Sequence, residues 1–136
     1  MLRRVAGVVG AAGDKGGVDT VALDVGDILG IAEYFVITTG TNSRQIRTIV
    51  DAVEENMSST RPDATPRVEG LEESEWVLVD FGDIVVHVFD PGSRDLYDLE
   101  RLWADAPVVD TGAGAGGVGE DGVEEDADVA ATRARL

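Results

Sequence analysis

The segment WVLVDFGDIVVHVF, residues 76–89, carries the clearest structural pattern in the chain. Two apolar runs of strand length, 76–80 and 84–89, flank a Phe-Gly-Asp connection, and a glycine in so short a connection favours a tight reversal. The segment therefore predicts a β-hairpin. It also holds one of the two tryptophans and the single histidine, so a functional surface is first sought around it.

Side chains alternate between the two faces of a strand, so the first strand of this hairpin presents two different rows. Val77, Val79 and Phe81 form a uniformly apolar row, which we expect to face the core. The second row consists of Trp76, Leu78 and Asp80. An aromatic ring, a leucine and a carboxylate can together be presented to a partner, or the tryptophan can be packed under a helix. The pattern alone leaves both interpretations open.

Elsewhere the periodic patterns predict an α/β fold, in which helices pack on a mixed β-sheet of four to five strands. The further strands are expected at residues 20–25, 34–39 and 67–69, the last as a short edge strand. Helices are expected at residues 3–12 and 43–58. The second helix has Asn42 as its expected N-cap.

A third helix is expected at residues 94–104, with Ser93 as its N-cap. Leu96, Leu99 and Trp103 are spaced to form its buried stripe. On its outer side, Arg94 and Asp98 are spaced to form an ion pair.

Length and composition predict one folded domain, residues 1–106, followed by a tail, residues 107–136. The tail is rich in Gly, Ala, Asp and Glu and has no aromatic residue, so we expect it to be disordered. The N-terminal MLRRVAGVVGAAG is interpreted as a helix rather than a signal peptide, and no stretch has the length of a membrane span. The absence of cysteine suits a reducing compartment. These features predict a cytoplasmic protein with no membrane partner.

The net charge of −16 argues against direct binding to nucleic acid, because an acidic surface repels phosphates. Residues before Pro107 also carry an excess of acids, so the tail is not the sole source of this charge. A basic partner, such as the protein component of a nucleoprotein particle, would be attracted instead. The alternative is that the charge serves solubility alone.

Candidate catalytic groups are few. His87 lies within a strand pattern with no serine or metal motif beside it, which favours a structural or interface histidine. The loop TTGTNS, residues 38–43, precedes a helix N-terminus and could hold an anion, although it lacks the lysine of a P-loop. Asp80 and Asp83 could bind Mg²⁺ for nucleotidyl transfer. A solvated hairpin tip is the favoured interpretation, so we expect no catalytic residue, cofactor or metal site.

Several stretches resemble the ribosomal silencing factor family RsfS, also called Iojap. They include D-x-x-ALDV at 19–25, EYFVITTGTNSRQIRTIVDAVEE at 33–55, EG at 69–70, WVLVDFGDIVVHVFD at 76–90 and RDLYDLERLWADA at 94–106. The resemblance covers most of residues 19–106 in the order typical of the family. The glycine-rich N-terminal helix, the acidic EGLEESEW approach to the hairpin and the tail depart from the family pattern.

The resemblance implies a nucleotidyltransferase-like fold without the catalytic carboxylates. It also implies binding to the large ribosomal subunit through its fourteenth ribosomal protein, which would block joining of the small subunit and lower translation when nutrients are short. The family contacts carry over to Trp76, Leu78 and Asp80, with Glu69, Asp83 and Tyr97 as neighbours. Two alternatives remain: a Mg²⁺-dependent nucleotidyltransferase-like enzyme, and a homodimeric scaffold for another basic partner.

Overall fold

Five strands form one mixed sheet in the order β1-β2-β5-β4-β3 in a computed structural model that describes residues 2–111, except residues 31 and 64. The central pair, β2 and β5, is parallel, and the other neighbours are antiparallel. The strands are β1 (Val18–Asp24), β2 (Tyr34–Thr39), β3 (Arg67–Glu69), β4 (Trp76–Asp80) and β5 (Ile84–Phe89). The helices are α1 (Leu2–Asp14), α2 (Gly26–Leu29), α3 (Ser43–Thr60), α4 (Pro91–Tyr97) and α5 (Leu99–Leu102). This arrangement confirms the predicted mixed α/β fold.

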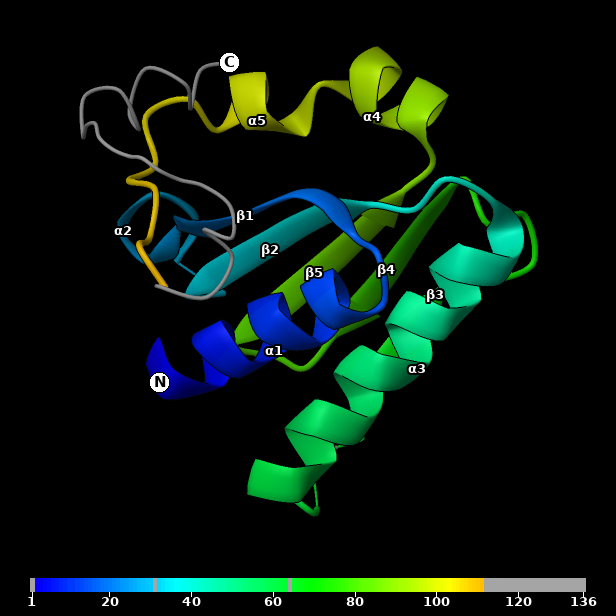
Figure 1. Cartoon of the computed structure of the whole chain (residues 1–136). Coiled ribbons are helices and arrows are strands. Elements are labelled where there is room, and N and C mark those ends of the chain that lie inside the picture. Colours follow the sequence, from blue (N-terminus) through cyan, green and yellow to red (C-terminus); the bar gives the residue numbers. More distant parts are fainter. Residues whose placement is uncertain (1, 31, 64, 112–136) are drawn as a thin grey trace.

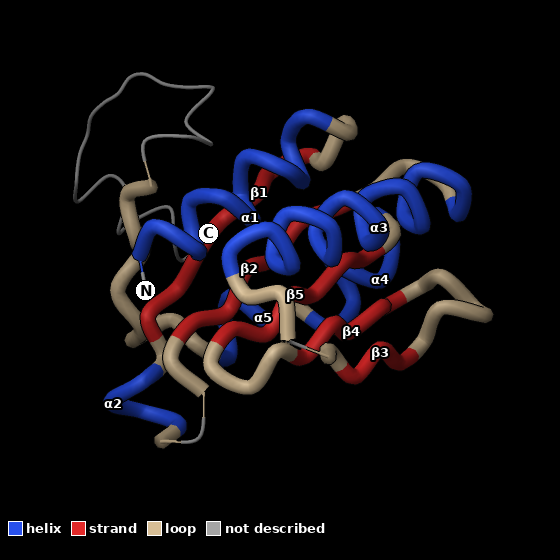
Figure 2. The backbone as a smooth tube through the Cα atoms, turned by 90° about the horizontal axis from the view of Figure 1, so that it is seen from below, coloured by secondary structure: helices blue, strands red, loops and turns tan. Residues whose placement is uncertain are grey.

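The two long helices cover one face of the sheet. α1 packs on β1 and β2, α3 packs on β4 and β5, and the two helices contact each other (Figures 1 and 2). The predicted stripes are confirmed, because α1 buries Val5, Val8, Val9 and Ala12, and α3 buries Ile46, Ile49, Val50, Val53 and Met57. Asn42 is the N-cap of α3, and its side chain accepts a hydrogen bond from the Gln45 backbone N–H. None of the described helices is long and apolar enough to cross a membrane.

The opposite face is covered by the short helices α4 and α5 and by the chain that follows them (Figure 1). Here the prediction of one helix over residues 94–104 is wrong. α4 begins after Asp90, whose carboxylate accepts from the Ser93 N–H, and Pro91 occupies the first turn. Asp98 has φ 48°, in the left-handed region, and separates α4 from α5.

This break changes which side chains are buried. After Asp98 turns the chain, Leu99 packs on the sheet and Trp103 is half-buried there, whereas Leu96 is 76% exposed. Arg94 does not pair with Asp98 as expected. Its guanidinium donates to both oxygens of Glu100, at 3.2 and 2.7 Å, which stabilises the bend between the two helices.

The chain remains in contact with the sheet beyond the predicted domain boundary at residue 106. Pro107 O accepts from the Asp24 N–H, Val108 forms a bridge with Leu23, and the Val109 N–H donates to Ala22 O. The segment 107–109 therefore lies along the outer edge of β1. Most of the predicted tail, from residue 112 onward, lies outside the described residues.

Candidate protein-binding surface

The two rows of β4 have different environments, as strand alternation predicts. Val77 and Val79 are fully buried against α1 and α3, which confirms that this row faces the core. Trp76, Leu78 and Asp80 are half-buried on the opposite face. The second row is therefore partly packed and partly accessible.

Trp76 contacts three neighbouring side chains. Its Nε1–H donates to Nδ1 of His87 at 3.1 Å. Its ring centroid lies 4.7 Å from that of Tyr97 at the end of α4 and 5.0 Å from that of Phe89 on β5. This tryptophan thus packs beside a helix, and it is also half-exposed, so that part of its ring is accessible.

His87 lies in the middle of β5 and is 4% exposed. Its ring is 4.6 Å from Phe35 in an edge-to-face arrangement. Burial lowers the pKa of His87 to about 4, because the charged form loses its hydration, while the Asp80 carboxylate acts in the opposite direction. The imidazole is therefore neutral at pH 7. Since Nδ1 accepts from Trp76, its proton is on Nε2.

Glu69 and Tyr97 lie beside this row. Glu69 is the cross-strand partner of Leu78, so the two side chains share a face of the sheet, and Glu69 is exposed. Tyr97 is 50% exposed, and its ring contacts that of Trp76 at an interplanar angle of 45°. We refer to Trp76, Leu78, Asp80, Glu69 and Tyr97 together as the Trp76 surface. Leu96 is an exposed neighbour that the sequence pattern had assigned to the core.

Asp83 is not part of this surface. Its Oδ2 lies 3.0 Å from Nη1 of Arg4, on α1, and 3.5 Å from Nη1 of Arg61, just after α3. Its backbone oxygen also accepts hydrogen bonds from Glu33 and Tyr34. These contacts tie the hairpin turn to the helices on the other face of the sheet.

The residues that could support nucleotide chemistry are engaged within the protein. Asp80 Oδ1 accepts from the Gly82 N–H at 2.8 Å, and Asp83 is in the ion pairs just described. At the start of α3, the Thr41 N–H donates to Gln45 Oε1, and the Gln45 N–H donates to Asn42 Oδ1. Two N–H groups that an anion would use are thus satisfied by side chains. Within the described part of the chain, no group of three or more acidic or histidine residues is arranged to hold a metal ion.

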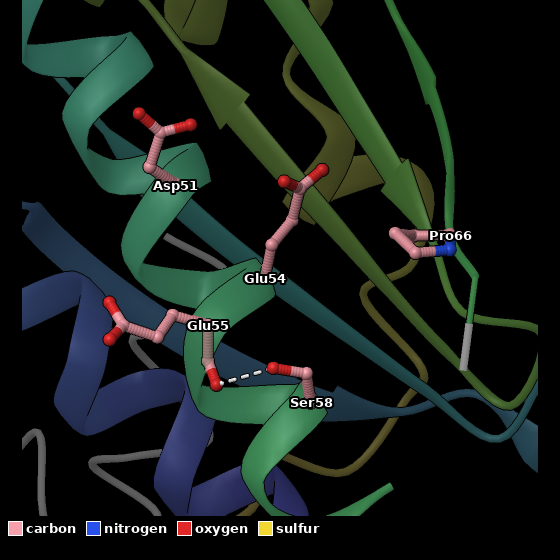
Figure 3. A pocket seen from close by; sticks show the side chains of 5 residues that line it. All are labelled: Asp51, Glu54, Glu55, Ser58 and Pro66. Atoms are coloured by element: carbon pink, nitrogen blue, oxygen red, sulfur yellow. Dashed lines mark hydrogen bonds between the residues drawn. The ribbon is translucent and has the colours of Figure 1, made fainter. Parts of the chain in front are cut away.

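A second surface feature is an open acidic hollow between α3 and Pro66, lined also by Asp51, Glu54, Glu55 and Ser58 (Figure 3). Glu54 points toward Pro66, whereas Asp51 and Glu55 point away from it. Partial burial, with the nearby Asp51, raises the pKa of Glu54. The diverging carboxylates of this hollow do not converge on a common ligand.

The geometry defines an α/β domain that presents half-exposed aromatic and aliphatic side chains next to carboxylates, an arrangement typical of surfaces that bind other macromolecules. The family model for RsfS, described as ribosomal silencing factor during starvation, matches residues 2–135. The chain therefore belongs to the RsfS family of translation regulators, which confirms the resemblance inferred from the sequence.

Individual relatives agree with this assignment. The ribosomal silencing factor RsfS of Bacillus subtilis is 42% identical over 104 residues, which cover 74% of this chain and 84% of that protein. The mouse protein named mitochondrial assembly of ribosomal large subunit protein 1 is 32% identical over 62% of this chain and 38% of its own length. A crystal structure of a Chromobacterium violaceum protein matches with a TM-score of 0.65 at 35% identity, covering 71% of this chain and 79% of that one.

Proposed function

We propose that this protein binds the large ribosomal subunit through the fourteenth large-subunit ribosomal protein and thereby blocks joining of the small subunit. Translation would be repressed in this way when nutrients are limiting. The action is steric, so it needs neither a catalytic residue nor a cofactor, and it would take place in the cytoplasm.

One observation carries the proposal. The row of Trp76, Leu78 and Asp80, to which the family contacts carry over, is half-exposed on the face of the sheet that α4, α5 and the following chain cover. Glu69, opposite Leu78, and Asp80, two residues further along β4, add negative charge to the same row, which suits a basic ribosomal protein. The names of two relatives, ribosomal silencing factor and mitochondrial assembly of ribosomal large subunit protein 1, support the same partner.

Sedimentation through a sucrose gradient tests this function. Purified protein should migrate with isolated large subunits at low salt and should reduce the joining of added small subunits. Failure to migrate with large subunits, or undisturbed subunit joining at saturating protein, would exclude the proposed function. Sedimentation of the protein alone in the same buffer reports whether it forms a homodimer.

The alternative of a nucleotidyltransferase-like enzyme has a direct test as well. Calorimetry with Mg²⁺ and nucleoside triphosphates should give no binding, because Asp83 is already paired with Arg4 and Arg61. Micromolar binding of a triphosphate would favour the enzyme.

A further inference from the structure

We propose that His87 is a positioning residue for the partner surface: through Nδ1 it fixes the indole of Trp76 in the orientation that a partner binds. This inference rests on the proposed function, because it assigns a role to a residue behind the Trp76 surface. His87 itself would not touch the partner, since it is 4% exposed.

The first argument is the geometry of the indole. Trp76 Nε1–H is the only polar group of that side chain, and it is directed into the protein at His87 Nδ1, 3.1 Å away. Phe89 and Tyr97 pack against the ring system at 5.0 and 4.7 Å. One hydrogen bond and two ring contacts together restrict both torsions of the side chain, so the accessible part of the ring is apolar.

The second argument is that Nδ1 stays an acceptor at neutral pH. A protonated imidazole would carry hydrogens on both nitrogens and would face the indole N–H with a second donor. Burial keeps the imidazole neutral, as the lowered pKa of His87 indicates. The hydrogen bond to Trp76 is therefore present throughout the pH range in which ribosomes function.

The third argument is that a histidine is not the residue that folding alone favours at this position. Nε2 of His87 is buried and has no hydrogen-bond partner among the described residues. Its row on β5 is otherwise apolar, with Val85 and Phe89 on either side. A buried polar group without a partner destabilises the folded state, and an aliphatic side chain would avoid this cost. The hydrogen bond to Trp76 is the compensating contact that the structure provides.

Fixing the ring in advance favours binding because the partner does not have to order it. An aromatic anchor that is already in its bound orientation loses less conformational freedom when the complex forms. If the Trp76–His87 hydrogen bond is lost, the partner must order the ring itself. The net contribution of one hydrogen bond corresponds to about a fivefold change in affinity.

The test compares three variants of the full chain. His87→Leu removes the acceptor and keeps an apolar side chain. His87→Asn keeps an acceptor, because its amide oxygen occupies nearly the position of Nδ1. Val86→Ala is the matched control, since it is also on β5 but faces α1 and α3. If His87→Leu does not fold, His87→Val takes its place, because valine suits a strand.

Two measurements are made on each variant. The first is the NMR signal of the Trp76 indole N–H and its rate of hydrogen exchange, with Trp76→Phe used to distinguish it from Trp103. The second is the dissociation constant for isolated large subunits. His87→Leu should shift the indole signal, accelerate exchange about tenfold and weaken binding about fivefold. His87→Asn should restore both measurements to near wild type, and Val86→Ala should change neither.

The outcomes separate the two proposals. If His87→Leu alters the indole signal but binds large subunits as tightly as wild type, His87 is only structural and the positioning role is wrong. If the indole signal does not respond to His87→Leu, the hydrogen bond does not hold the ring and the inference also fails. If the wild-type protein itself does not bind large subunits, the proposed function fails, and the positioning role for a ribosomal partner fails with it even where the indole signal responds as expected.

Discussion

The two faces of the sheet differ in composition and in cover. On the face under α1 and α3, the strand residues Val77, Val79, Val86 and Val88 are all 0% exposed, and the cluster around them is apolar. The opposite face contains His87, the aromatic rings of Phe35, Phe89 and Trp103, and the half-exposed Trp76 and Leu78. One side of the sheet thus supplies stability, while the other combines packing with an accessible surface.

Helix length explains this difference. α1 and α3 have 13 and 18 residues, enough to cover the sheet from β1 to β4, whereas α4 and α5 have 7 and 4. The short helices bury side chains of β2 and β5, such as Ile37 and Phe89, but leave those of β4 half-exposed. The Trp76 surface therefore lies where the cover provided by these short helices ends.

The largest effect is expected from a cavity on the α1 and α3 face. Ile49 is fully buried in α3, so Ile49→Ala removes packed methyl groups and should destabilise the protein by about 3 to 4 kcal/mol. Urea unfolding monitored by circular dichroism measures this change. The fraction that remains folded should bind large subunits with unaltered affinity, and a loss of affinity would show that the two faces are not independent.

Acidification should destabilise the protein through His87, which lies on the face of the sheet opposite α1 and α3. Its pKa is about 4 in the folded protein and 6.5 as the ordinary value, so the unfolded chain takes up the proton first as pH falls. Stability from this group is complete above pH 6.5 and declines toward pH 4, by about 3 kcal/mol in total.

The difference between wild type and His87→Asn isolates this contribution from that of the carboxylates, which titrate in both proteins. Urea midpoints are measured for both proteins at pH 7 and pH 4. The midpoint of wild type should fall more between these pH values than the midpoint of His87→Asn. An equal difference at both pH values would mean that His87 takes up its proton with the same pKa in the folded and the unfolded protein, and that burial does not lower it.

Sequence patterns predicted the buried side chains on the face under α1 and α3 almost completely. The stripe of α3 and the alternation of Val77 and Val79 follow directly from helical and strand periods, because both elements bury one whole side. The break at Asp98 was missed because the spacing of Leu96, Leu99 and Trp103 also fits one continuous helix. Only the left-handed conformation of Asp98 and the contact of Arg94 with Glu100 distinguish the two structures.

For the candidate site, periodicity identified the row of Trp76, Leu78 and Asp80 but not its surroundings. The bond between Trp76 and His87 depends on the register of β4 against β5, which places Trp76 opposite Phe89 and His87 opposite Leu78. Asp83 was expected beside the row because the family contacts carry over to it. Its pairing with Arg4, about eighty residues away along the chain, is a tertiary contact that no local pattern shows.

Truncation of Trp76 should affect binding more than folding. Trp76→Ala removes a half-exposed aromatic anchor and should weaken binding to large subunits by about 2 kcal/mol or more, roughly thirtyfold. The contacts with Phe89 and Tyr97 are lost as well, so a smaller loss of stability, about 1 to 2 kcal/mol, accompanies it. Val77→Ala, one residue along and on the opposite face, is the matched control. Val77→Ala should lower the stability of the protein and leave its affinity for large subunits unchanged. If Val77→Ala weakened binding while Trp76→Ala only lowered stability, the face under α1 and α3 would be the one that binds the partner.

The smallest effect is expected from the charge of Asp80. Asp80→Asn keeps the oxygen that accepts from the Gly82 N–H, so the hairpin turn is preserved while one negative charge is removed. Asp80→Arg reverses the charge and also removes that acceptor. If the surface meets a basic protein, Asp80→Asn should slow association by a few fold at low salt, about 1 kcal/mol or less, and Asp80→Arg should slow it further.

Both differences should fade as salt is raised, because screening weakens the attraction between exposed charges. Glu55→Gln removes the same charge from α3, on the other face of the sheet, and should have no effect on the association rate beyond that of net charge. Rates measured by stopped flow at several salt concentrations provide the comparison. Equal slowing by Asp80→Asn and Glu55→Gln would mean that the partner responds to the overall charge of the domain, and that Asp80 has no specific place in the interface.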